Sequence, residues 1–131
     1  MIHHIQLRVY YEDTDLAGIV YYANYLKFIE RGRTEWVRSL GLDQMRLKSE
    51  QGMVFAVRRV EADYLSPARF DDCLDVTTEL VSLGGARILL NQTVKRGEAV
   101  LFAAKVTLVA ISDAGAAVRL PDALRVALGR G

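Results

Sequence analysis

One segment of this chain has the hydrophobic period of a long helix, and that segment limits the folds open to it. Over residues 24–40 the apolar side chains recur at steps of three, four and seven residues, the pattern of an amphipathic helix. The apolar positions are Tyr25, Phe28, Ile29, Trp36, Val37 and Leu40. Gly41 stands where a glycine commonly follows a helix, and Arg31 and Glu35 have the i,i+4 spacing of an ion pair. We therefore expect one long helix that buries its apolar face against another layer.

Most of the remaining chain has strand patterns. Residues 2–11 alternate, with Ile5, Leu7 and Val9 on one face. Further strand-like segments cover residues 53–65, 74–83, 87–95 and 99–112, and two shorter helices are expected at 43–50 and 121–128. The turn signals between strands are Ser66-Pro67-Ala68, Gly84-Gly85 and Arg96-Gly97-Glu98. An early strand, one long helix and four antiparallel strands predict an α+β fold, with a five-stranded sheet wrapped around the helix.

Length and composition bound the class of protein. The 131 residues are enough for one domain with a proper core, over residues 1–131, and 51% hydrophobic with 25% charged residues is ordinary for a globular chain. The formal net charge of +1 argues against nucleic-acid binding through a broad basic field. The apolar runs fall far short of the roughly 20 residues that span a bilayer, so no transmembrane segment is expected, and no N-terminal signal is expected either. The single cysteine, Cys73, suits a reducing cytoplasm.

A carboxylate lies just before the long helix, in the short turn Asp-Leu-Ala-Gly of residues 15–18. The N-terminus of a helix offers unpaired N–H groups and a partial positive charge that polarise a carbonyl. A carboxylate a few residues upstream, Asp15, has the chemistry of a nucleophile or a general base for acyl transfer. The alternative is that Asp15 only caps its own turn, which is a common structural role for aspartate.

The same block resembles the active-site segment of hotdog-fold acyl-CoA thioesterases, in particular the 4-hydroxybenzoyl-CoA thioesterase family and the tol-pal system-associated acyl-CoA thioesterases. The resemblance rests on residues 11–15 (YEDTD), 18, 20–21, 23–25, 28, 30–31, 33–35 and 40–41. It continues through residues 64–69 (YLSPAR) and 71–72, and more loosely over the remaining strands. The fold it implies is the sheet around a helix that the hydrophobic pattern also predicts.

The resemblance implies that the chain hydrolyses acyl-CoA thioesters. It makes Asp15 the catalytic carboxylate, either attacking to give a mixed anhydride or deprotonating a water, and it directs the backbone N–H of Tyr22 at the thioester carbonyl. Gly18 allows a tight turn close to the substrate. The neighbouring residues Ile19, Val20 and Tyr21 are expected to shape the mouth of the acyl site, with Tyr25 behind them or packed in the core. No metal or redox cofactor is required, and the acyl-CoA is the substrate.

Basic residues are candidates for holding the CoA phosphates. Arg87, just past the Gly84-Gly85 turn, falls where related thioesterases place such residues, and Arg58 and Arg59 are weaker candidates. Each of these arginines is otherwise an ordinary surface charge. Because exposed sheet edges are hazardous to leave open, we expect a homodimer, assembling to a homotetramer as in the family, with CoA contacts from more than one subunit.

The acyl group and two rival functions stay open at this stage. Many tol-pal-associated members have histidine where this chain has Tyr22, whereas 4-hydroxybenzoyl-CoA enzymes have tyrosine there, which favours an aromatic acyl group slightly over short- and medium-chain groups. A hotdog hydratase or dehydratase needs a histidine in its site, but the two histidines, His3 and His4, are adjacent at the N-terminus and predicted to be ordinary strand residues. A binding or scaffold protein without turnover is the second alternative.

Overall fold

A computed structural model describes residues 1–129 of the chain. The elements in order are β1 (Ile2–Arg8), the 3-10 turn η1 (Tyr11–Asp13), α1 (Asn24–Ser39), α2 (Gln44–Gln51), β2 (Met53–Tyr64), β3 (Cys73–Leu83), β4 (Arg87–Arg96), β5 (Ala99–Ser112) and α3 (Asp122–Gly129). Their bounds agree with the sequence prediction to within a few residues. The exception is β1, which ends at Arg8 rather than residue 11, because the chain turns into η1 there.

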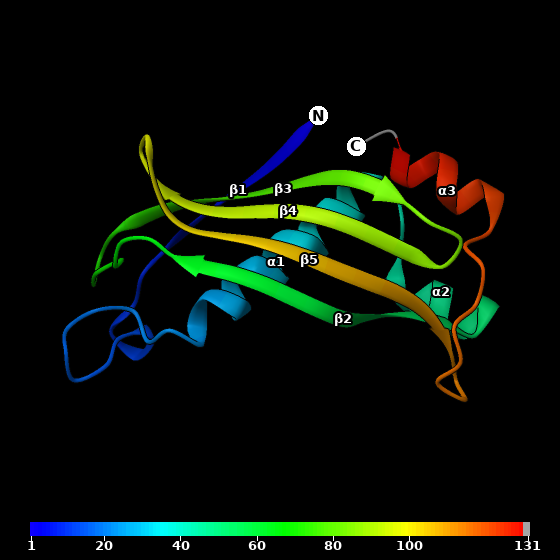
Figure 1. Ribbon diagram of the computed structural model, residues 1–131, viewed down its shortest axis with the longest axis horizontal. Coiled ribbons are helices and arrows are strands. Elements are labelled where there is room, and N and C mark those ends of the chain that lie inside the picture. Colours follow the sequence, from blue (N-terminus) through cyan, green and yellow to red (C-terminus); the bar gives the residue numbers. More distant parts are fainter. Residues whose placement is uncertain (130–131) are drawn as a thin grey trace.

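The five strands form one antiparallel sheet in the order β1-β3-β4-β5-β2 (Figure 1). The predicted α+β fold is therefore confirmed. The order of strands in the sheet differs from their order in the chain, because β2 pairs with β5 rather than with β1 or β3. Strand β2 is one edge of the sheet and β1 is the other. Strand β2 carries an irregularity at Arg58, where the register against β5 shifts between Val57 and Arg59.

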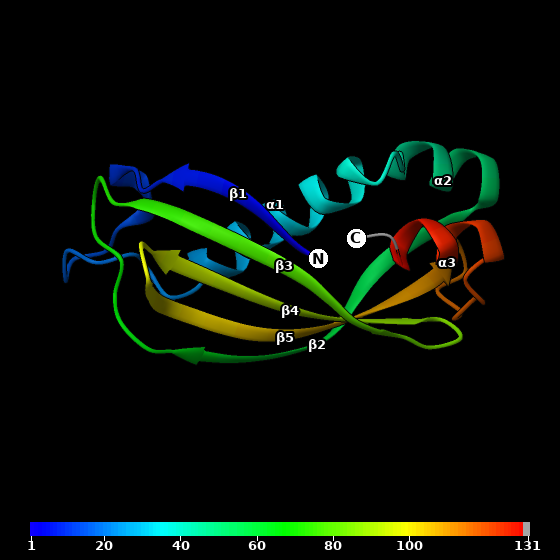
Figure 2. The same ribbon diagram turned by 90° about the horizontal axis from the view of Figure 1, so that it is seen from above.

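Helix α1 lies across one face of the sheet, which curves around it (Figure 2). Its buried residues include Phe28, Ile29 and Trp36, each 1% exposed, as the three- and four-residue spacing predicts. Complete burial of side chains of this size stabilises the fold by about 1.5–3 kcal/mol each. Gly32 lies on the same face, and a Cβ added there would stand 2.9 Å from Val76 Cγ1. The missing side chain lets the helix backbone approach β3 and β4 closely.

A buried polar network joins α1 to the sheet beside Gly32. Gln92 of β4 is completely buried, and its amide nitrogen donates to the Ile29 carbonyl and to Thr78 Oγ1, both at 2.9 Å. Its amide oxygen accepts from the Arg33 guanidinium at 3.0 Å. Removal of Arg33 from water lowers the pKa of its guanidinium, with Glu30 opposing that change. All polar atoms of the Gln92 amide are thus paired, which fixes the position of the helix along the sheet.

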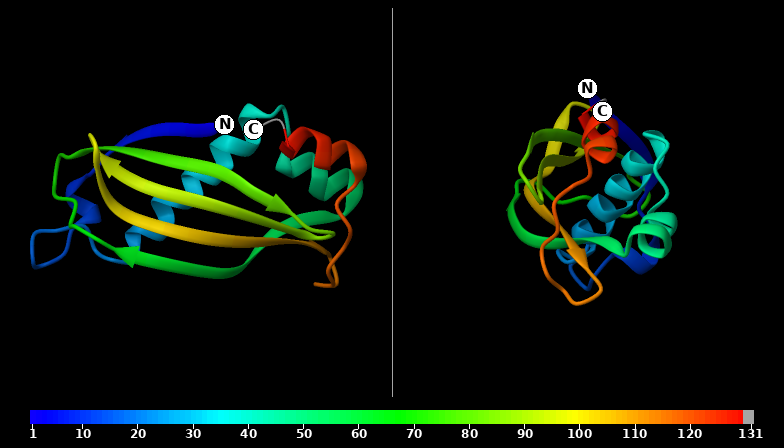
Figure 3. Two further views of the ribbon diagram at one scale, coloured as in Figure 1. Left: turned by 45° about the horizontal axis from the view of Figure 1, so that its top comes forward. Right: turned by 90° about the vertical axis from the view of Figure 1, so that its right-hand side faces the viewer.

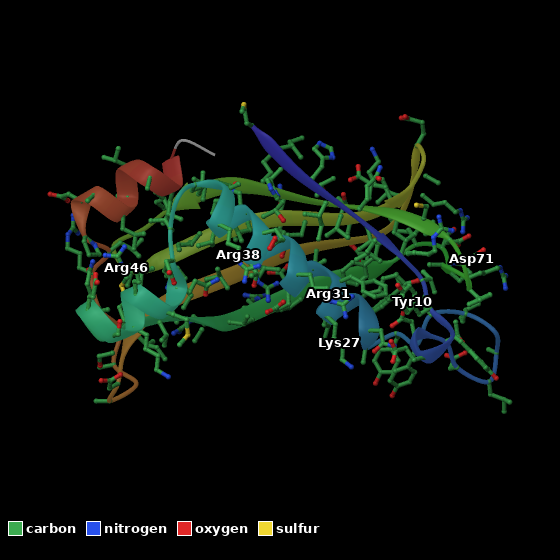
Figure 4. The ribbon with its side chains drawn as sticks, turned by 180° about the vertical axis from the view of Figure 1, so that it is seen from behind. Tyr10, Lys27, Arg31, Arg38, Arg46 and Asp71 are labelled. Atoms are coloured by element: carbon green, nitrogen blue, oxygen red, sulfur yellow. The ribbon has the colours of Figure 1, made fainter. Side chains whose placement is uncertain are left out.

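The outer face of α1 is polar and turned away from the sheet, with Lys27, Arg31 and Arg38 along it (Figure 4). The predicted Arg31–Glu35 ion pair is wrong, because Glu35 pairs with Arg38 one turn later. The Arg31 guanidinium instead lies 5.9 Å from the centre of the Phe28 ring. The C-terminal glycine prediction is confirmed by Gly41, whose φ of 79° is a left-handed conformation.

The two ends of the sheet carry different structures (Figures 1 and 3). At one end lie the loop of residues 9–23, the N-terminus of α1 and the last residues of β2. At the other end, α3 packs beside the β3–β4 turn, where Arg125 donates to the Gly84 carbonyl. In the part of the chain that the structure describes, no helix is both long and apolar enough to cross a membrane.

Candidate active site

The loop that leads into α1 is held by Asp13. The Asp13 carbonyl accepts hydrogen bonds from the Tyr21 N–H and from the Asn24 side-chain amide, both at 2.9 Å. Its carboxylate accepts from the Tyr10 N–H at 2.8 Å. The carboxylate and the carbonyl of Asp13 together brace this turn. These bonds fix the start of the loop against the start of the helix.

Asp15 lies in a small hairpin within this loop. Its N–H donates to the Ile19 carbonyl at 2.9 Å, and one carboxylate oxygen accepts the Ala17 N–H at 2.9 Å. The turn needs the left-handed conformation of Gly18, whose φ is 80°. The capping role considered from sequence is therefore present, but it uses only Oδ1. Within residues 1–129, no protein donor reaches Oδ2, so half of this carboxylate is free for chemistry.

The N-terminus of α1 has no side-chain cap. Its N-cap residue, Ala23, has no oxygen to offer, and among the described residues the Tyr22 N–H donates to no acceptor. Helix N-termini normally satisfy such groups with a serine, threonine or aspartate side chain. An uncapped end keeps its N–H groups and its partial positive charge available to a ligand.

Asp15 and Tyr22 line one cavity of about 360 Å³. Six of the residues that line this cavity were predicted from the sequence as site residues. Gly18, which was also predicted, forms the turn beside the cavity but does not line it. Four further lining residues, 64–67 at the end of β2, were not predicted as site residues, although they belong to the YLSPAR segment that carried the resemblance. The full lining is Asp15, Ile19, Val20, Tyr21, Tyr22, Tyr25, Tyr64, Leu65, Ser66 and Pro67.

Aromatic rings form the wall of this cavity. Tyr25 stacks on Phe102 with ring centres 5.1 Å apart, and its hydroxyl accepts the Ala68 N–H at 3.0 Å. Tyr64 meets the rings of Tyr25, Phe102 and Tyr22 edge to face. Burial raises the pKa of both the Tyr25 and Tyr64 hydroxyls, so both stay protonated at neutral pH. Both hydroxyl groups are hydrogen-bonded, so the Tyr25 and Tyr64 rings contribute mainly aromatic carbon to the cavity wall.

The arginines predicted to bind CoA do not line the Asp15 cavity of the same chain. Arg87 begins β4 next to the β3–β4 turn, at the end of the sheet opposite the loop of residues 9–23 (Figure 1). Arg58 and Arg59 lie at the irregularity of edge strand β2, and Arg59 pairs with Glu61 at 3.1 Å. A single copy of the chain therefore does not bring these arginines to the carboxylate.

A larger hollow of about 920 Å³ lies on the sheet face away from α1, but it lacks the features of the Asp15 cavity. Its lining mixes acids, lysines and threonines with His4, and contains no helix terminus. His4 is exposed, and its ring Nδ1 forms a hydrogen bond with the Asp75 carboxylate at 2.8 Å. His3 is half-buried and points to the other face of the sheet, so the two histidines are placed as ordinary strand residues are. Within residues 1–129, no three His, Cys, Asp or Glu side chains gather as metal ligands would.

Comparisons with known proteins find similar thioesterases by sequence and by fold. The family model of the Thioesterase superfamily matches residues 17–103. Acyl-CoA thioesterase YbgC of Haemophilus influenzae is 46% identical over 109 residues, which are 83% of this chain and 79% of that protein. Acyl-CoA thioester hydrolase YbgC of Escherichia coli O157:H7 is 42% identical over 92 residues, 70% of this chain and 68% of that protein. The crystal structure of a probable thioesterase from Bartonella henselae superposes with a TM-score of 0.88 at 40% identity, covering 92% of this chain and 100% of that one.

Proposed function

This chain belongs to the thioesterase superfamily and is an acyl-CoA thioesterase, and we propose that it hydrolyses the thioester with the Asp15 carboxylate opposite the Tyr22 N–H. The observation that carries the proposal is that an incompletely paired carboxylate and an uncapped helix N-terminus line the same cavity. Thioester hydrolysis needs both groups, because negative charge develops on the carbonyl oxygen while an oxygen nucleophile approaches the carbonyl carbon.

The thioester carbonyl accepts the Tyr22 N–H and lies in the positive field of the α1 N-terminus. A preorganised donor of this kind lowers the barrier by about 3 kcal/mol. Two routes then use Asp15. In the first, a carboxylate oxygen attacks the carbonyl carbon, the C–S bond breaks with release of the CoA thiolate, and water cleaves the mixed anhydride. In the second, the carboxylate takes a proton from a water that attacks directly, and the thiolate leaves with the C–S bond electrons.

The cavity wall supports an aromatic acyl group. Tyr21, Tyr22 and Tyr64 are 45%, 61% and 48% exposed, so three large rings face solvent around the opening. Exposed aromatic rings at the rim of a cavity favour stacking against a flat apolar ligand. A relative that is 32% identical over 67% of this chain is named as a 1,4-dihydroxy-2-naphthoyl-CoA hydrolase, which acts on an aromatic acyl group.

Assembly supplies the missing CoA contacts in this proposal. Strand β2 is an edge strand whose residues from Val57 onward are exposed, and such an edge pairs readily with a second copy. We propose a homodimer through this edge, assembling to a homotetramer, with Arg87, Arg58 and Arg59 contacting the CoA of a neighbouring subunit. The chemistry requires only a carboxylate, an amide and water, so no cofactor is involved. We propose that the protein acts in the cytoplasm, where a reducing environment keeps a free thiol such as that of Cys73 unoxidised.

Release of free thiol from a panel of acyl-CoAs tests the proposal. The panel spans benzoyl, hydroxybenzoyl, short straight-chain and long-chain thioesters, assayed with the wild type and Asp15→Asn. We expect aromatic thioesters to be hydrolysed fastest and Asp15→Asn to lose about 10²- to 10⁴-fold in kcat. Asp43→Asn is the matched control, since Asp43 also accepts backbone N–H groups at 2.9 and 3.2 Å but at the start of α2. Unchanged turnover in Asp15→Asn would refute the assignment of the carboxylate.

A further inference from the structure

Tyr22 has fewer backbone restraints than its neighbours in the loop. Tyr21 is held by its N–H bond to Asp13, and the Asn24 N–H donates to the Tyr21 carbonyl at 2.8 Å. Within residues 1–129 the Tyr22 N–H has no acceptor, and Leu26, which could donate to the Tyr22 carbonyl in a regular helix, donates to Ala23 instead at 3.2 Å. The Tyr22 side chain is 61% exposed, and its ring meets those of Tyr21 and Tyr64 edge to face.

The backbone carbonyl of Tyr22 is held by a single side chain. The Tyr64 hydroxyl donates to the Tyr22 carbonyl at 3.0 Å, across 42 residues of sequence. This bond joins the last residue of β2 to the turn before α1, two segments that lie at the same end of the sheet (Figures 1 and 3). Within the described chain, it is the only hydrogen bond made by the backbone of Tyr22.

Tyr64 is itself well placed to act as an anchor. Its backbone pairs with Phe102 of β5, and its ring centre lies 5.0 Å from that of Phe102 and 5.5 Å from that of Tyr25. Phe102 is completely buried and Tyr25 is 3% exposed, so the ring of Tyr64 rests on rigid core. The hydroxyl of this half-exposed side chain reaches from the core to the Tyr22 carbonyl.

From these contacts we infer that Tyr64 is a positioning residue for the reaction: its hydroxyl fixes the Tyr22 carbonyl and thereby aims the Tyr22 N–H at the thioester oxygen. The inference rests on the proposed role of that N–H. The Tyr22 N–H lies in the peptide plane of the Tyr21 carbonyl, which accepts the Asn24 N–H, and the Tyr22 carbonyl lies in the next plane. The two planes meet at the Tyr22 Cα, so a tether on the Tyr22 carbonyl fixes the second plane as well and limits the φ and ψ changes that would turn the N–H away. A donor that is already aimed stabilises the transition state without reorganising during the reaction.

The first test separates the hydroxyl of Tyr64 from its ring. Tyr64→Phe keeps the ring contacts and removes only the bond to Tyr22, so we expect kcat to fall about tenfold, the loss that one hydrogen bond commonly produces. KM is expected to stay within about twofold, because this bond affects the polarisation of the transition state more than ground-state binding. Tyr11→Phe is the control: Tyr11 is 83% exposed, outside the cavity, and its hydroxyl has no partner among the described residues. A Tyr64→Phe enzyme with wild-type kcat would overturn the inference.

The second test observes the carbonyl directly. An acyl-CoA labelled with ¹³C at the thioester carbonyl is bound to Asp15→Asn and to the Asp15→Asn/Tyr64→Phe double variant, and the carbonyl stretch is recorded by infrared difference spectroscopy. We expect a band shifted to lower frequency in Asp15→Asn, relative to the same compound in an aprotic solvent, and a shift back or a broader band in the double variant.

The outcomes test the Tyr22 N–H donor and the Tyr64 hydroxyl separately. A lowered frequency that is the same in both proteins overturns the role of Tyr64 and leaves the Tyr22 donor standing. An unshifted band in Asp15→Asn itself overturns the Tyr22 donor, and with it the role given to Tyr64. A merely structural role for the Tyr64 hydroxyl would lower Tm without moving the band or kcat.

Discussion

Replacement of Gly32 by alanine tests how α1 is seated on the sheet. In an exposed helix this change is stabilising by about 1 kcal/mol, because alanine has the higher helix propensity. Here the new Cβ would lie 2.9 Å from Val76 Cγ1, 3.1 Å from Thr78 Oγ1 and 3.3 Å from Gln92 Nε2. Two of these atoms belong to the buried network that joins the helix to the sheet, so they cannot move apart without loss of hydrogen bonds.

The expected cost follows from these contacts. Overpacking in a tight core costs about 1–3 kcal/mol, and a buried amide left with a broken bond costs about 1–3 kcal/mol more. After subtraction of the propensity gain, Gly32→Ala should destabilise the protein by about 1–5 kcal/mol. For a chain of this length that corresponds to a Tm lower by roughly 3–25 °C.

Urea unfolding followed by tryptophan fluorescence measures this effect directly. Trp36 is the only tryptophan, is 1% exposed and follows Gly32 by one helical turn, so its emission reports on the same interface. Protein concentration is held constant, because association shifts apparent stability. Gly85→Ala is the control, since its Cβ would meet only the Arg119 side chain at 3.8 Å and should change stability by no more than about 0.5 kcal/mol. A Gly32→Ala protein as stable as the wild type would refute the close seating of α1.

Two further substitutions probe the cavity and its loop. Tyr25→Phe leaves the buried Ala68 N–H without its acceptor and should destabilise by about 1–3 kcal/mol in thermal unfolding. Because burial raises the pKa of Tyr25 above its ordinary value of 10.0, the folded state holds this proton more tightly, so stability is constant below that pH and falls as pH rises through the folded pKa. Tyr25→Phe should therefore show a shallower loss of stability above about pH 10, and an unchanged slope would contradict this linkage. Asn24→Ala removes the 2.9 Å bond to the Asp13 carbonyl and should lower kcat about five- to tenfold in steady-state assays, while a wild-type kcat would show that the loop is held without it.

The sequence was sufficient for the features that depend on local pattern. The helix over residues 24–39 and the strand at residues 99–112 follow from hydrophobic spacing, and Gly41 and Gly18 adopt the left-handed conformations that their turns need. The turn that holds Asp15 and the helix start that follows it are neighbours in sequence, so their place in one cavity was predictable.

The features that sequence did not reveal depend on the order of strands. Tyr64 reaches Tyr22 only because β2 pairs with β5 at the sheet edge, and nothing in the local pattern specifies that neighbour. A polar Gln92 on a strand gives no sign that it is completely buried under α1. The Arg31–Glu35 prediction failed because a third residue, Arg38, competes for the same carboxylate.

The most direct measurement is a crystal structure of Asp15→Asn with the acyl-CoA that the wild type hydrolyses fastest. The proposed mechanism predicts the thioester carbonyl oxygen about 3 Å from the Tyr22 nitrogen, and the carbonyl carbon about 3–3.5 Å from the side chain at position 15. The nucleotide should extend out of the cavity toward arginines of a neighbouring subunit. An acyl group bound instead in the hollow on the outer face of the sheet, beside His4 and Lys105, or a carbonyl turned away from Tyr22, would contradict the mechanism.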